Sequence, residues 1–171
     1  MIPTLTTDRL ILRVPQLGDT AASVAFILSD RARLMVDAMT EDEARAEFAA
    51  VIDHWAMRGF GLFAITLKGS ATAIGLAGPW MPQTHPEPEI GWNLWDGAYE
   101  GKGIATEATR AARTWAFAAQ GWETAVSYIH PDNTASIRLA TRIGAVPDPD
   151  ASCPYPPPVL IYRHHAGAVA A

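Results

Sequence analysis

The chain has 171 residues, of which 49% are hydrophobic and 18% are charged, so it is long enough for one domain with its own core and too apolar for a disordered protein. Its formal net charge of −5 argues against nucleic acid or an anionic membrane as a partner and fits an amine-bearing partner better. Cys153 is the only cysteine, which excludes an intrachain disulfide and a cysteine-based zinc site. No secretory signal or bilayer-spanning apolar segment is recognisable, so we expect a cytoplasmic protein.

The N-terminal third predicts one strand followed by two helices. Residues 7–14 alternate between polar and apolar side chains, which is typical of a half-buried strand. Asp19 is expected to cap a short helix. Thr40 and Glu43 have the spacing of a capping box, and the helix that they open should end before Gly59.

The middle of the chain predicts a β-hairpin and a further strand. Two apolar runs, 61–67 and 72–77, are separated by a short turn sequence. A proline-rich loop is expected over 79–88, because proline cannot donate a backbone hydrogen bond. Residues 89–95 then predict a strand, in which Gly91 indicates a bulge or a close backbone approach.

The second half predicts helices alternating with strands. From Ile104 the apolar residues recur on one helical stripe, and residues 124–129 read as a strand. Asn133 is expected to cap the next helix, and a last strand is expected over 159–163.

The whole chain, 1–171, predicts a single mixed α/β domain. No repeat and no linker between two cores is visible in the sequence. The segment 147–158 holds six prolines and is expected to be a loop. The Ala-rich tail, 166–171, is expected to fray.

A short glycine segment, Gly101-Lys102-Gly103-Ile104-Ala105, joins a predicted strand to a predicted helix. Free backbone N–H groups at the positive end of a helix attract anions, and small residues let phosphate oxygens approach the main chain. The segment has neither the Gly-Lys-Ser/Thr ending of a Walker loop nor the third glycine of a dinucleotide fingerprint. By itself it fits a tight turn as well as a phosphate site.

Four segments extend this interpretation: Thr7-Asp8-Arg9-Leu10-Ile11-Leu12-Arg13, Glu89-Ile90-Gly91-Trp92, the stretch 99–108 and Asn133-Thr134-Ala135-Ser136-Ile137-Arg138. In this order they resemble the GNAT N-acetyltransferases, particularly the branch that acetylates the N-termini of ribosomal proteins, and the resemblance covers nearly all of the chain. It implies the GNAT fold, a mixed and mostly antiparallel sheet of about six to seven strands flanked by about four helices and splayed at the strand before the glycine loop. It also implies acetyl-CoA as cosubstrate and no metal.

The resemblance assigns a cofactor site. In the family the pyrophosphate lies on a loop of the form Arg/Gln-x-x-Gly-x-Gly/Ala, which maps onto Glu100, Gly103 and Ala105. Glu100 departs from this pattern, and a carboxylate there would repel pyrophosphate unless it points to solvent. The main chain of 93–95 is expected to pair with the pantetheine arm, and Asn133 to lie near the thiol, with N-capping as its alternative role. The cofactor-binding residues predicted in this way are Asn93, Leu94, Trp95, Glu100, Gly101, Lys102, Gly103, Ile104, Ala105, Thr106 and Asn133.

The resemblance also suggests catalytic residues. Acetyl transfer to an amine needs a proton acceptor for the amine and a proton source for the departing thiolate. Glu89 is the predicted acceptor, with a surface role at a strand end as the alternative. The tyrosine that many family members use as acid is replaced here by Ala140, so Ser136 is the predicted donor, with N-terminal capping as its alternative. Tyr128, on the strand expected to face the cofactor, is a second candidate for the active cleft.

The histidines predict no metal site. His164 and His165 are adjacent on a strand and should point to opposite faces. His54, His85 and His130 are interpreted as structural or solvated.

Three functions remain open at this level. The first is an acetyltransferase that acts on a protein N-terminus or a small amine, as a monomer or homodimer. The second is a catalytically silent GNAT module that binds acyl-CoA, which the departures at Glu100 and Ala140 would suit. The third is a structural or interaction domain whose glycine turn binds nothing.

Overall fold

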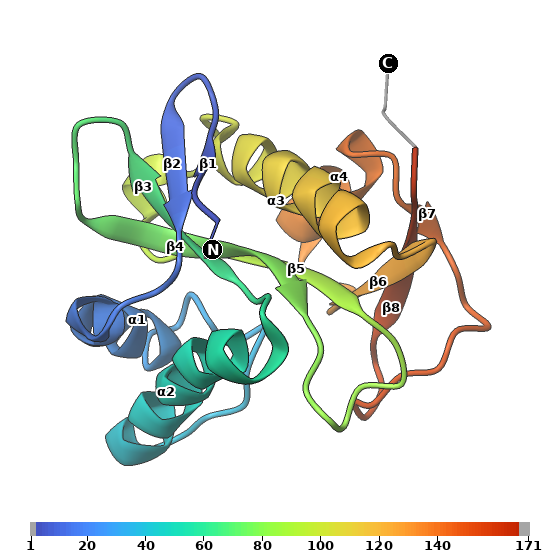
Figure 1. Cartoon of the computed structure of the whole chain (residues 1–171). Helices are drawn as coiled ribbons and strands as arrows, with labels where there is room; N and C mark the ends of the chain where they lie inside the picture. Colours follow the sequence, from blue (N-terminus) through green and yellow to red (C-terminus); the bar gives the residue numbers. More distant parts are fainter. Residues whose placement is uncertain (1–2, 168–171) are drawn as a thin grey trace.

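The computed structural model describes residues 3–167, which form an α/β fold around one mixed sheet (Figure 1). The elements in chain order are β1 (Leu5–Thr6), β2 (Leu10–Arg13), the 3-10 turn η1 (Leu17–Asp19), α1 (Thr20–Ile27), α2 (Glu41–Arg58), β3 (Phe63–Leu67), β4 (Ala73–Trp80), β5 (Glu89–Leu94), the 3-10 turn η2 (Gly97–Tyr99), α3 (Ile104–Gln120), β6 (Thr124–Ile129), α4 (Thr134–Arg142), β7 (Val146–Pro147) and β8 (Leu160–His165). The predicted fold class is confirmed. The two-residue strands β1 and β7 raise the number of strands in the described part of the chain to eight.

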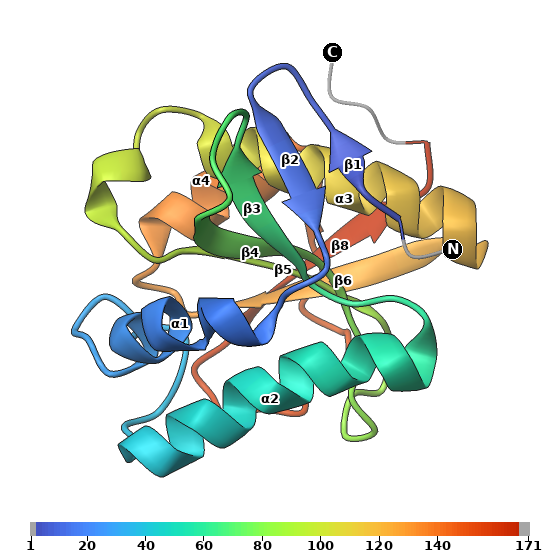
Figure 2. The same ribbon diagram turned by 60° about the vertical axis from the view of Figure 1, so that its left-hand side comes forward.

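The sheet has the strand order β1-β2-β3-β4-β5-β6-β8-β7. Figures 1 and 2 show α1 and α2 on one face of this sheet and α3 and α4 on the other. Two of the hydrophobic clusters lie between the sheet and the helices. One joins Leu12, Phe63 and Ile65 to α3, and the other joins Ala64 and Leu76 to α2, as the two-residue alternation of β3 requires.

Strands β5 and β6 are the parallel neighbours of the sheet, and they pair at a single position, Glu89 with Val126. By contrast, β4 and β5 pair along the whole length of β5. A side-chain bond supplements the contact, because the Ser127 hydroxyl donates to the Ile90 carbonyl at 2.5 Å. The two strands are therefore held at one end only, which is the splay expected before the glycine loop. We call this junction the β5–β6 seam.

The capping box of α2 is confirmed. The backbone N–H of Glu43 donates to the Thr40 hydroxyl at 3.3 Å, and the N–H of Thr40 donates back to the Glu43 carboxylate at 2.7 Å. The helix ends at Arg58, and Gly59 follows with a left-handed φ of 75°, which glycine adopts at no steric cost.

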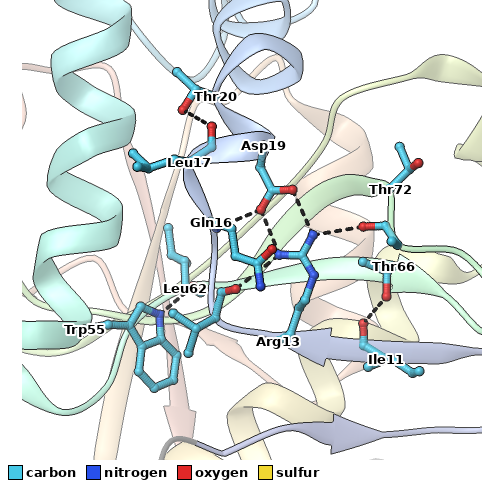
Figure 3. Close-up of polar contacts among 12 residues, drawn as sticks. Ile11, Arg13, Gln16, Leu17, Asp19, Thr20, Trp55, Leu62, Thr66 and Thr72 are labelled. Carbon is cyan, nitrogen blue, oxygen red and sulfur yellow. Dashed lines mark hydrogen bonds and ion pairs between the residues drawn. The ribbon is translucent and has the colours of Figure 1, made fainter.

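The predicted capping role of Asp19 is wrong. Asp19 stands directly before α1, but its carboxylate does not cap that helix. Figure 3 shows it facing Arg13, whose two terminal nitrogens both donate to it at 2.8 Å, while the N–H of Gln16 donates at 2.8 Å. A two-pronged charged pair is stronger than a bond to a neutral helix amide, so it takes the carboxylate. The hydrogen bond from Arg13 to Asp19 also raises the pKa of the guanidinium.

Several element ends differ from the sequence prediction by a few residues. β2 is shorter than 7–14, β4 continues through Trp80 into the expected proline loop, and β8 continues to His165. Of the tail expected to fray, 168–171 lie outside the described residues, and Ala166 donates its N–H to the carbonyl of Glu123 at 2.9 Å. No helix within residues 3–167 is long and apolar enough to cross a membrane.

Candidate active site

The glycine segment forms a turn that opens α3. Gly101 and Gly103 have left-handed φ values of 68° and 75°, which residues with a Cβ adopt only with strain. The first hydrogen bond of the helix runs from the N–H of Glu107 to the carbonyl of Gly103 at 3.0 Å. The N–H groups of 104–106 precede it in the first turn, where an α-helix offers no acceptor, so they are available at the positive end of the helix. This geometry suits a bound anion.

The opening segment of the chain fixes this turn in place. The Thr7 hydroxyl donates to the Glu107 carboxylate at 2.5 Å, and the Arg9 side chain donates to the same carboxylate at 2.7 Å. Arg9 also donates to the carbonyl of Lys102 at 2.9 Å. Burial alone would raise the pKa of Glu107, but these hydrogen bonds outweigh it and leave the pKa below its ordinary value. Residues 7–9 therefore support the glycine segment from the neighbouring hairpin.

A groove of about 430 Å³ runs from the end of β5 past the start of α3 to the start of α4. We call it the cofactor groove. The predicted residues that line it are Asn93, Leu94, Glu100, Gly101, Gly103, Ile104, Ala105, Thr106, Asn133 and Ser136. It brings together three segments that are separate in sequence.

Two predicted cofactor residues, Trp95 and Lys102, do not line the groove. The Trp95 ring lies in the core on the α2 side, edge-on to Phe48 at 6.1 Å between centroids. Its backbone N–H donates to the carbonyl of Ile74 at 2.9 Å and extends the pairing of β5 with β4. Lys102 is exposed, and its carbonyl accepts from Arg9.

At the far end of the groove, Asn133 and Ser136 begin α4. The Asn133 side-chain oxygen accepts from the N–H of Ser136 at 3.1 Å, which confirms the predicted N-cap. The Ser136 hydroxyl accepts a hydrogen bond from the indole N–H of Trp92 at 3.2 Å. Because the hydroxyl oxygen is the acceptor in that contact, its own proton remains available for donation. Asn93 is engaged elsewhere, since its side-chain oxygen accepts from the N–H of Leu76 at 3.1 Å.

Glu89 lies outside the cofactor groove, at the β5–β6 seam. Side chains alternate along β5, so Glu89 points to the face opposite Trp92 and Ser136. Its carboxylate is 2.9 Å from His85 Nε2, and the two side chains are only 14% and 3% exposed. An ionised carboxylate can only accept, so Nε2 carries the proton of this bond. The structure thus gives Glu89 a buried partner.

Two tyrosines complete this cluster. The Tyr155 hydroxyl is 3.1 Å from His85 Nε2, and the rings of His85, Tyr128 and Tyr155 meet edge to face at 5.5 to 5.7 Å. Burial first, and then the nearby carboxylates, raise the pKa of both tyrosines above the ordinary value. Both phenols therefore stay protonated at neutral pH. We call Glu89 and these three rings the acceptor cluster.

Sequence reasoning missed His85, Tyr155 and Arg31. His85 lies in the proline-rich loop and is buried against Glu89 rather than solvated. Arg31, between α1 and α2, lines the cofactor groove and pairs with Glu100 at 2.7 Å. The contacts of Tyr155 and Arg31 have no local sequence signature, because their partners are 70 and 69 residues away along the chain. His85 is only four residues from Glu89, but its position in an irregular loop gave no sign of that contact.

Other histidines have structural contacts. His54 lies between the carbonyl of Phe60, at 2.8 Å, and the N–H of Met81, at 3.2 Å. His164 is fully buried and 2.8 Å from the Ser127 hydroxyl. No three His, Cys, Asp or Glu side chains within residues 3–167 come together as a metal site.

Comparison with known proteins agrees with this geometry. The model of the acetyltransferase (GNAT) domain family matches residues 9–146. An acetyltransferase from Agrobacterium tumefaciens is 36% identical, with 96% of this chain and 95% of that chain covered and a TM-score of 0.90. The ribosomal-protein-S5-alanine acetyltransferase from Vibrio fischeri shares the fold at 16% identity, with 99% and 100% covered and a TM-score of 0.75. RimL, a ribosomal L7/L12 alpha-N-protein acetyltransferase solved with coenzyme A, does so at 18% identity, with 97% and 99% covered and a TM-score of 0.75. Matched over most of its length, the chain belongs to the GNAT acetyltransferase family, and its likeness to the RimL-type enzymes is one of fold.

Proposed function

We propose that the protein is an N-acetyltransferase that moves an acetyl group from acetyl-CoA to a primary amine. The observation that carries the proposal is the cofactor groove, because it joins the open first turn of α3 to the end of β5 and to the start of α4. A polyanion with a long polar arm fits such a shape. Membership of the GNAT family supports the same cosubstrate, since GNAT domains bind acetyl-CoA.

The residues of the groove suit the parts of acetyl-CoA. The N–H groups of 104–106 would hold the pyrophosphate, and left-handed Gly101 and Gly103 keep the main chain open to it. The main chain at Asn93 and Leu94 would bind the pantetheine arm, and Asn133 would lie near its thiol end. Bound there, acetyl-CoA supplies a thioester that is activated toward amines.

Glu89 is the proposed proton acceptor. An alkylamine is mostly protonated at neutral pH and must lose a proton before it can attack. The carboxylate of Glu89 is held by His85 at 2.9 Å and lies where β5 and β6 are joined. Beyond this joined end the two strands separate, and in the proposal the amine reaches the cofactor groove through that gap.

Ser136 is the proposed donor to the departing sulfur. Its hydroxyl oxygen accepts from Trp92, which orients the hydroxyl proton away from the indole and leaves it free for the groove. In the complete reaction the protonated amine first gives one proton to Glu89, and its nitrogen then forms a bond to the acetyl carbon as the carbon–sulfur bond breaks. The second proton leaves the nitrogen for solvent, and the sulfur takes a proton from Ser136, which regains one from solvent. The buried methyl group of Ala140 has no ionisable proton, so it cannot protonate the departing sulfur.

The acceptor in this proposal is a protein N-terminus or a small amine. The carboxylate of Glu89 favours a cationic group at the seam, whereas the nearby Glu87 is paired with Arg163 at 2.6 Å. The net charge of −5 also favours a cationic acceptor.

The test is thiol release from acetyl-CoA in the presence of a panel of peptides with free N-termini and of small primary amines. We expect release above the hydrolysis background with at least one amine, and a product heavier by one acetyl group by mass spectrometry. Calorimetry with CoA runs in parallel. Binding of CoA with no turnover across the panel would show a silent acyl-CoA-binding module instead, and absence of any binding or thermal shift with millimolar CoA would refute both functions.

A further inference from the structure

An ion pair crosses one wall of the cofactor groove. Arg31 Nη2 donates to Glu100 Oε1 at 2.7 Å and to the carbonyl of Leu94 at 3.2 Å. Arg31 comes from the segment between α1 and α2, whereas Glu100 immediately precedes the glycine turn. All three residues line the groove. The guanidinium therefore ties the end of β5 to the start of the phosphate loop.

Gly97 makes room for this guanidinium. A Cβ placed on Gly97 would come within 2.7 Å of Arg31 Nη1, closer than real Cβ contacts. A side chain at position 97 would therefore require the flexible guanidinium to shift from its present position. The Arg31 side chain is 34% exposed, so part of it faces the open groove.

The charge of Glu100 opposes the chemistry of the groove. The charged residues lining it are Arg31, Glu100, Arg138 and Arg142, so Glu100 is the carboxylate among three cations. A free carboxylate next to a turn that offers N–H groups to an anion would repel that anion. In the structure this carboxylate is not free, because the positive charge of Arg31 lies against it and neutralises it.

We propose that Arg31 is a cofactor-binding residue that acts by neutralising Glu100, so that the groove accepts the pyrophosphate of CoA despite an acidic residue in the phosphate loop. The inference rests on the proposed use of acetyl-CoA. In this proposal the negative charge in the phosphate loop is neutralised by a residue outside the loop, on the segment that leads into α2.

The test is calorimetry with two ligands, CoA and pantetheine, where pantetheine has the arm but no phosphate. Arg31→Met removes the cation and should weaken CoA binding about fivefold, with a clearly smaller effect on pantetheine, which loses only the bond that steadies the Leu94 carbonyl. Glu100→Gln should bind CoA at least as tightly as the wild type. The double variant Arg31→Met with Glu100→Gln should recover to within about twofold of the wild type, because no carboxylate is left to neutralise.

Arg33→Met is the matched control. Arg33 lies on the same segment and is exposed, and it is not among the residues that line the groove, so the same loss of charge there should leave CoA binding unchanged. Thermal melting of each variant without ligand verifies that it is folded.

Three results would overturn the inference: CoA affinity unchanged in Arg31→Met, an equal loss of pantetheine affinity, or a double variant as weak as Arg31→Met. The last result would mean that Arg31 supports CoA binding in some way other than by neutralising Glu100. If the folded wild type binds no CoA at all, the proposed function fails, and the inference fails with it for that separate reason.

Discussion

The two sides of the β5–β6 seam are built from different parts of the chain. On the side of α3 and α4, the site consists mainly of backbone N–H groups, glycines and helix caps in short continuous segments, to which Arg31 adds one side chain from the segment between α1 and α2. On the other side it consists of side chains only, Glu89 with His85 and two tyrosines, which come from two strands and two loops. A backbone site resists substitution, because most side-chain changes leave it intact. A side-chain site can change its chemistry while the fold stays the same.

The substitution Glu89→Gln tests whether the two sides of the site act separately, and it has the largest expected effect. Removing a general base typically costs a factor of about 10² or more in turnover, so we expect kcat to fall by at least about a hundredfold. Affinity for CoA should be unchanged, because Glu89 does not line the cofactor groove. Steady-state kinetics and calorimetry on the same preparation measure both. Loss of CoA affinity together with turnover would mean that the two sides are not separate.

Glu123→Gln is a suitable control for that experiment. Glu123 is exposed immediately before β6, and its backbone carbonyl accepts a hydrogen bond from the N–H of Ala166. Its substitution should change neither kcat nor CoA affinity.

The stability of the folded chain should depend on pH through a buried histidine at the β5–β6 seam. His164 contacts Ser127, and Ser127 holds β5 through the Ile90 carbonyl. Burial first, and then the charges of Arg113, His165 and Arg163, lower the pKa of His164 to about 3. The unfolded chain takes up a proton near pH 6.5 that the folded chain refuses, so stability is full above pH 6.5 and falls as the pH decreases toward 3.

Between pH 7 and pH 5 this histidine alone should lower the free energy of unfolding by about 2 kcal/mol. Urea titrations of the wild type and of His164→Gln at both pH values measure the effect, because contributions from the other groups cancel in the difference. A difference between the two proteins that stays constant with pH would contradict the assigned protonation of His164.

The smallest of these effects concerns the positioning of Glu89. His85→Phe removes the hydrogen bond to the carboxylate and should lower kcat about tenfold, since a bond to a charged group contributes about 1.5–3 kcal/mol. KM for acetyl-CoA should stay constant. His85→Gln, which keeps an N–H donor, should restore part of the loss. If the Gln variant were as slow as the Phe variant while both melted like the wild type, His85 would have no positioning role.

Local rules were enough for most of the fold and for most of the cofactor groove. The capping box at Thr40, the cap at Asn133 and the glycine turn at residue 103 depend on neighbours within a few residues, and all are present. Strand alternation likewise predicted most of the sheet. These features could be read from the sequence because each is completed by its own segment.

The predictions that failed, on both sides of the site and outside it, depend on contacts that form only in the folded chain. His85 was interpreted as structural or solvated because it lies in a proline-rich loop, and only the fold brings Tyr155 to within 3.1 Å of it. Asp19 had the position of a cap, but Arg13 is brought beside it by the turn after β2 and takes its carboxylate. Trp95 follows the strand that borders the groove, yet its large ring is buried against α2. In each case a tertiary contact overrides a local preference.

The pairing of Arg31 with Glu100 also has an evolutionary consequence. Two positions 69 residues apart share one electrostatic task, so a change at either one alters the selection on the other. Among descendants of a common ancestor, an acidic residue at position 100 should be inherited together with a basic residue at position 31. Lineages with an uncharged or basic residue at position 100 should be free to vary at position 31 and to fill the space above Gly97.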